Sequence, residues 1–244
     1  MRISYKLLFL FLSFPLFVHA QIGEHRNTLS LGGNAGYNLT TIRFTPKVVQ
    51  SMKGGMSFGF TARYTVEKYF STIASVQAEV NYSQMGWKED IRDPNDQPVI
   101  NTTTGVAEKY ERTINYFQIP FFAHLAWGRE NRGVNFFVNA GPQLGIYLNE
   151  STKSNFDWDK RNMSDRANSI VAQDTMNVEN KIDYGIAAGL GMELATKKLG
   201  RFTVEARYYY GLGNIYGDSK RDYFGSSNFG AIMIKVGWLW DVMK

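Results

Sequence analysis

Hydrophobic and polar residues alternate in eight segments of this chain. In the segment 56–66 the even positions read Met, Phe, Phe, Ala, Tyr and Val, whereas the odd positions between them read Ser, Gly, Thr, Arg and Thr. A period of two is typical of β-strands, because successive side chains point to opposite faces of a sheet. The segments are 29–39, 56–66, 74–83, 116–127, 135–146, 182–193, 202–210 and 231–240. The pattern therefore predicts an all-β protein with eight strands, each apolar on one face only.

The connections between these segments are alternately long and short. The long ones span 40–54, 88–109, 149–180 and 213–227, and the short ones span 67–71, 128–133 and 195–200. Outer-membrane barrels have short turns on the periplasmic side and longer loops outside the cell. The sequence thus predicts an eight-stranded antiparallel transmembrane outer-membrane β-barrel. We expect both termini to be periplasmic and outer-membrane lipid to surround the wall.

The first twenty residues differ from the rest of the chain. Arg2 and Lys6 precede an apolar stretch over 7–18, and the small residue Ala20 stands just before Gln21. A charged start, a short apolar stretch and a small residue at the cleavage point are typical of a secretory signal peptide. The stretch is too short to cross a membrane as a helix. We expect residues 1–20 to be the signal peptide and residues 21–244 to form one barrel domain.

Composition and charge exclude several classes of function. The sequence contains no Cys, so disulfides and thiol chemistry are excluded. The net charge of +5 includes Arg2 and Lys6, which leaves +3 on residues 21–244. This mild imbalance gives no support for nucleic-acid binding. Aromatic residues make up 15% of the chain, which fits the aromatic rings that line both membrane edges of a barrel.

Six charged residues occupy inward positions of the predicted barrel. They are Arg63, Glu79, Glu193, Glu205, Arg207 and Lys235. An eight-stranded barrel is just wide enough to be filled by side chains, and unpaired ions inside it would be costly. We therefore predict a lumen charge network that plugs the barrel, in preference to an ion path or a paired-carboxylate site. The small inward residues Gly185, Gly189 and Gly191 are expected to make room for Arg207 and Tyr209.

Further inward polar residues are Gln118, His124 and Tyr209. His124 together with Ser83 and Glu79 could form the triad of a barrel-embedded lipid hydrolase, but nothing in their spacing demands it. A histidine hydrogen-bonded in the lumen is the favoured interpretation. A metal site is disfavoured, because His25 and His124 are the only imidazoles after the signal peptide and lie far apart in sequence. We predict no catalytic residue, no metal and no cofactor.

The longest connection, 149–180, offers candidates for contact with a partner. It carries Asp157, Trp158 and Asp159, followed by Lys160 and Arg161, on the predicted cell surface. An exposed aromatic among charges often contacts another molecule, although a solvated, mobile loop is favoured over a dedicated binding site.

Several motifs resemble the PorT-like outer-membrane β-barrel proteins of Bacteroidota, a family named after a component of the type IX secretion system. The resemblance covers essentially all of the chain after residue 20. It is carried by Tyr-Phe-Gln-Ile-Pro at 116–120, Gly-Pro-Gln-Leu-Gly at 141–145, Asp-Tyr-Gly at 183–185, Gly-Leu-Gly-Met-Glu at 189–193, and Arg-Tyr-Tyr-Tyr-Gly-Leu-Gly-Asn-Ile at 207–215. One departure is the carboxyl end, where Trp240 is followed by four further residues.

The resemblance implies fold and location more firmly than a task. We expect a non-enzymatic protein that acts by contact, as an accessory of protein secretion or envelope assembly, with other envelope or secretion-system proteins as partners. The alternatives are a narrow porin-like channel and the barrel-embedded lipid hydrolase.

Overall fold

The computed structural model describes residues 23–130, 132–217 and 222–243. The predicted signal peptide lies outside these ranges. Within them, no helix is long and apolar enough to cross a membrane. The elements are β1 (Glu24–Thr45), β2 (Gln50–Ser51), β3 (Lys53–Tyr69), β4 (Thr72–Glu89), β5 (Tyr110–Trp127), β6 (Gly133–Ser154), the 3-10 turns η2 (Trp158–Lys160) and η3 (Ala172–Asp174), β7 (Ile182–Thr196), β8 (Gly200–Gly211) and β9 (Ser226–Met243).

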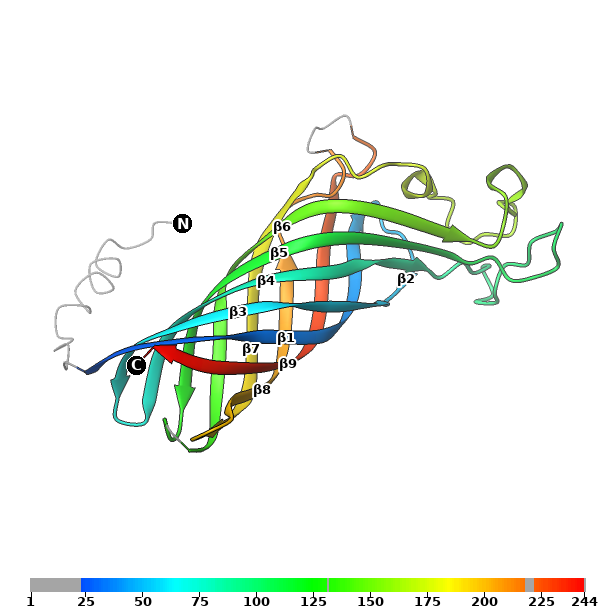
Figure 1. Cartoon of the computed structure of the whole chain (residues 1–244). Helices are drawn as coiled ribbons and strands as arrows, with labels where there is room; N and C mark the ends of the chain where they lie inside the picture. The colour runs from blue at the N-terminus through cyan, green and yellow to red at the C-terminus, as the bar shows by residue number, and fades with distance from the viewer. Residues whose placement is uncertain (1–22, 131, 218–221, 244) are drawn as a thin grey trace, which may run out of the picture.

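Eight long strands of the described chain close into an antiparallel ring (Figure 1). The ring runs β1, β3, β4, β5, β6, β7, β8 and β9, and it closes where β1 pairs with β9. Short β2 pairs only with the end of β4. The predicted eight-stranded barrel is therefore confirmed. The start of β1, the end of β9 and the short connections lie at one end, which we call the turn end, and the long connections lie at the other, which we call the loop end.

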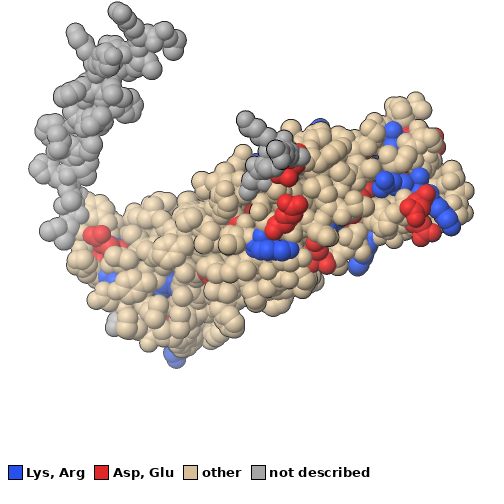
Figure 2. Space-filling view, turned by 90° about the horizontal axis from the view of Figure 1, so that it is seen from above, with Lys and Arg blue, Asp and Glu red and all other residues tan. Residues whose placement is uncertain are grey.

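The outer wall of the ring is apolar. Phe60 on β3 is 77% exposed and Leu190 on β7 is 67% exposed, and exposed and buried residues alternate along both strands as predicted. In Figure 2 the wall is almost entirely free of charge, whereas blue and red side chains gather toward the loop end. Outward aromatic residues ring the turn end, at Trp127, Phe136, Phe202, Trp238 and Trp240. A wall of this kind suits contact with lipid.

All eight long strands run beyond the segments that the sequence pattern predicts, and three of them project from the ring. Strands β4, β5 and β6 extend beyond the ring at the loop end (Figure 1). The pairing of β6 with β7 ends at Ile146, whereas its pairing with β5 continues to Ser154. The end of β4 escaped the search for outward apolar residues because the alternation changes sides there: Met85 and Trp87 point inward and are buried. The end of β6 escaped it because residues 149–154 are all polar.

Candidate functional site

The lumen near the turn end is filled by a chain of ion pairs. Arg63, on β3, pairs with Glu193, on β7. Glu193 also accepts a hydrogen bond from Arg201 at 2.9 Å, and Arg201 in turn lies 3.2 Å from Asp241. The alternation predicted Arg63 and Glu193 as lumen residues, but Arg201 and Asp241 were not among its candidates.

A second group of ion pairs crosses the middle of the lumen. Glu79 accepts hydrogen bonds from Arg207 at 2.7 Å and from Lys235 at 2.6 Å, and Arg207 also donates to Glu205 at 2.9 Å. The Arg207 guanidinium lies 4.5 Å from the centre of the Phe122 ring. All six predicted charged residues thus lie in the lumen with opposite charges as neighbours. The cavity beside them has a volume of about 20 Å³, which is room for about one water molecule.

The inward glycines of β7 make room for side chains across the lumen, as expected. A Cβ on Gly185 would lie 2.8 Å from the hydroxyl oxygen of Tyr209. A Cβ on Gly189 would collide with the carboxylate of Glu205, not with Arg207 as we had expected. The reason is that Arg207 reaches across to Glu79 and leaves the space beside Gly189 to Glu205.

The predicted polar lumen residues each have a partner of their own. Gln118 donates to the sulfur of Met85 at 2.9 Å, His124 Nδ1 lies 2.7 Å from Asn139 Oδ1, and the Tyr209 hydroxyl donates to Asp183 at 2.7 Å. These contacts fix side chains across the barrel, and none of them presents a group to a ligand.

The hydrolase triad that the sequence allowed is not assembled. His124 lies opposite Ser75 in the β4–β5 register, whereas Ser83 lies opposite Tyr116 and bonds to Asn38. Glu79 is held by Arg207 and Lys235. The structure therefore contradicts that alternative, because the three groups belong to different layers of the lumen. In the described ranges no three His, Cys, Asp or Glu side chains are grouped as metal ligands would be.

The connections at the loop end fold onto the inner face of the projecting strands. We call the projecting ends of three strands the platform, together with the connections packed on them. These ends are residues 85–89 of β4, 110–113 of β5 and 147–154 of β6. An aromatic cluster forms the core of the platform: Phe44 contacts Trp87, Tyr216 and Phe224, with ring centres 5.4, 6.1 and 4.8 Å apart. Rings of this size contribute much of the apolar contact in a core. The platform is therefore a packed structure, and the connections are not merely solvated loops.

The predicted contact residues lie at the far end of this core. Trp158 is half-buried and packs against Tyr110 and Phe156, with ring centres 5.6 and 5.5 Å apart. Its neighbours Asp157 and Asp159 are exposed. The expectation of an exposed Trp158 is corrected in part: the ring anchors the segment, and the two carboxylates are the groups presented to solvent.

Two acidic side chains meet inside the platform, outside the membrane-spanning parts of the strands. Glu89, at the end of β4, accepts a hydrogen bond from Gln173 at 2.6 Å, and Asp174 follows Gln173 in η3. Burial, and then the neighbouring Asp174 carboxyl, raise the pKa of Glu89 to about 8. Burial also raises the pKa of Asp174, although the hydrogen bond with Glu89 and the charges of the neighbouring arginines oppose the shift. The pair therefore holds a proton near neutral pH.

These platform residues were missed by sequence reasoning. Glu89 and Asp174 belong to connections in the predicted scheme, and only folding brings them together. Arg112, which bonds to Glu150 at 2.7 Å and to the Gln173 carbonyl at 2.9 Å, is equally far from its partners in sequence. The available signal was the continued alternation of Tyr110, Arg112 and Ile114 ahead of the predicted strand.

Residues 9–217 match the family described as outer membrane protein beta-barrel domain. Solved structures with a similar fold include Neisserial surface protein A (12% identity, TM-score 0.42, covering 86% of this chain and 96% of that one). Others are the attachment invasion locus protein Ail of Yersinia pestis (11%, 0.35, 88% and 100%) and the N-terminal β-barrel domain of Pseudomonas aeruginosa OprF (10%, 0.38, 89% and 100%). A comparison with curated protein sequences gives no match. The family match spans most of the chain, and the protein belongs to the outer-membrane β-barrel domain family.

Proposed function

We propose that this outer-membrane barrel acts by contact at the cell surface, through the platform, and is not an enzyme. In this proposal the turn end, with both termini, faces the periplasm and the loop end faces outward, as is usual for such barrels. The filled lumen supports contact over transport, because its ion pairs leave room for about one water molecule beside them.

The observation that carries the proposal is the free edge of β6. Beyond Ile146 this strand is paired with β5 on one side only, as far as Ser154. Within the described residues, no backbone hydrogen bond joins 148–154 to a strand on the other side. An exposed edge offers backbone N–H and C=O groups to an extended segment of another chain, which can add to the sheet as a further strand.

The side chains near this edge suit a polar partner. Asn149, Ser151 and Lys153 are exposed on β6. On the same platform, a recess of about 580 Å³ is lined by Lys88, Arg92, Glu108, Tyr110 and Asn155, among others. The exposed Asp157 and Asp159 add negative charge nearby. The resemblance to PorT-like proteins favours a partner from a secretion or envelope-assembly complex, and this identity is part of the proposal.

The test is photo-crosslinking in intact cells. A photo-reactive amino acid replaces Ser151 on the edge strand, and the control replaces Thr113, its cross-strand partner on β5. Both positions lie on the same face of the sheet, but only Ser151 lies at the edge. We expect one discrete crosslinked partner from Ser151 and none from Thr113. Equal crosslinking from both positions, or none from Ser151, would rule out edge pairing.

A further inference from the structure

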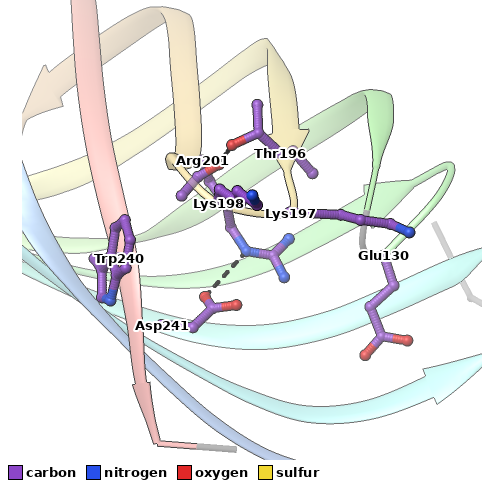
Figure 3. A pocket seen from close by; sticks show the side chains of 9 residues that line it. Glu130, Thr196, Lys197, Lys198, Arg201, Trp240 and Asp241 are labelled. Atoms are coloured by element: carbon purple, nitrogen blue, oxygen red, sulfur yellow. Dashed lines mark hydrogen bonds and ion pairs between the residues drawn. The ribbon is translucent and has the colours of Figure 1, made fainter.

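A second recess lies at the turn end, between the β7–β8 turn, the β5–β6 turn and the end of β9 (Figure 3). Its volume is about 390 Å³, within the usual range for small-ligand sites. Residues with charged or aromatic side chains dominate its lining: Glu130, Lys197, Lys198, Arg201, Trp240 and Asp241.

Both acidic groups of the recess are neutralised by neighbours. Asp241 lies 3.2 Å from Arg201 and accepts a hydrogen bond from Ser30 at 2.7 Å. Glu130 lies 2.8 Å from Arg26 and 3.4 Å from Lys68.

The two lysines of the β7–β8 turn are different. Lys197 and Lys198 are exposed, and within the described residues neither forms an ion pair. The recess therefore keeps an excess of positive charge at its rim.

The turn that carries these lysines is attached to the lipid-facing wall. The indole N–H of Trp238 donates a hydrogen bond to the Leu199 carbonyl at 2.7 Å, and the Leu199 side chain is 63% exposed. Trp240, two residues farther along β9, lines the recess and faces outward. Because Trp rings favour the boundary between lipid and water, the lysines lie at the level of the lipid headgroups.

The adjacent turn repeats the arrangement. Arg129 and Arg132 are exposed, and no ion pair involves them within the described ranges. They line a shallower recess together with Phe70 of the β3–β4 turn, which is 82% exposed. Unpaired cations beside exposed apolar side chains thus occur on two neighbouring turns of the same end, as expected for a rim that meets an anionic membrane surface.

We propose that the turn-end recess binds the phosphate group of an anionic phospholipid. Lys197 and Lys198 contact the phosphate, and the acyl chains lie against Leu199 and the Trp238 and Trp240 rings. The lysine ammonium suits phosphate as a compact positive charge. The inference needs only insertion in a bilayer, and it holds whichever way the barrel faces, so its failure is distinguishable from failure of the contact function.

The experiment measures tryptophan quenching by lipids with brominated acyl chains, using the mature chain in nanodiscs. The tryptophans of the turn end face the acyl chains, whereas Trp87 and Trp158 belong to the platform. We expect brominated phosphatidylglycerol to quench more strongly than brominated phosphatidylcholine. The preference is the ratio of the apparent affinities for the two lipids. In the double variant Lys197→Gln, Lys198→Gln this ratio falls about 30-fold, which is the effect of removing two cations that face an anionic surface.

Three comparisons make the result specific. The double variant Lys197→Arg, Lys198→Arg keeps both charges and keeps the preference. The double variant Lys109→Gln, Lys153→Gln removes two exposed lysines from the platform and leaves the preference unchanged. Inorganic phosphate at constant ionic strength does not compete. Equal quenching by the two lipids, an unchanged preference in the Lys197→Gln, Lys198→Gln variant, or displacement of the lipid by inorganic phosphate would each overturn the proposal.

Discussion

The stability of the platform depends on pH through its buried carboxyl pair, Glu89 and Asp174, and falls as the pH rises. The folded chain raises the pKa of Glu89 from its ordinary 4.5 to about 8, mainly by burial and then through Asp174. A raised carboxyl pKa means that the folded platform binds a proton more tightly than the unfolded one. The contribution to stability is therefore complete below about pH 4.5 and is lost as the pH rises through about 8.

The magnitude follows from the size of the pKa change. Each tenfold change in proton affinity is worth about 1.4 kcal/mol, so the wild-type platform loses at most about 5 kcal/mol between acidic and alkaline pH. The substitution Glu89→Gln removes the titrating group and keeps a hydrogen-bonding side chain of similar size beside Gln173. We expect this variant to be more stable than the wild type at pH above 8 and to show little of its pH dependence.

Hydrogen exchange with mass spectrometry measures the effect locally, on peptides that cover 85–92 and 170–178, after correction for intrinsic exchange rates. Glu111→Gln is the control on the same platform. Burial favours the neutral form of Glu111, but hydrogen bonds and charge from Lys53 and Lys88 outweigh burial and lower its pKa. Its contribution to stability is lost on acidification instead. If wild-type protection does not fall relative to Glu89→Gln as the pH is raised, the carboxyl pair does not hold a proton.

Three further outcomes follow from the lumen and the platform. Arg207→Ala leaves Glu205 buried without its ion-pair partner and leaves Glu79 with Lys235 alone, so it should lower the unfolding free energy by about 3–5 kcal/mol, measured by urea titration in micelles. In planar bilayers the wild-type barrel should lack porin-like conductance, and sustained open conductance would refute the plugged lumen. Trp87→Ala should cost about 3–5 kcal/mol of platform stability, seen as faster proteolysis of the loop end while the barrel still migrates as folded on unheated gels.

The barrel was predictable because lipid imposes a simple rule on its wall. Every second residue from Met56 to Val66 must be apolar, and a shift of one residue would turn the whole set inward, so the pattern specifies both strand and register. The partners inside the lumen follow less directly. Alternation identifies Glu79 and Lys235 as inward, but their ion pair joins β4 to β9, and it depends on how the ring closes.

The platform could not be predicted by the same rule, because its strands leave the lipid and the physical reason for outward apolar residues disappears. Water now surrounds the outer face, so the alternation persists with its faces exchanged: Tyr110 and Ile114 point inward, while Glu111 and Thr113 point outward. The point of exchange in each strand therefore marks where that strand leaves the membrane. In β4 the exchange falls after Tyr82, and in β5 it falls near Tyr116, where the pairing with β6 also shifts register. A sequence search that allows the apolar face to switch once per strand would find β4 and β5 at their full length. It would not find the free edge of β6, because residues 149–154 are polar on both faces and are held in the sheet by their pairing with β5.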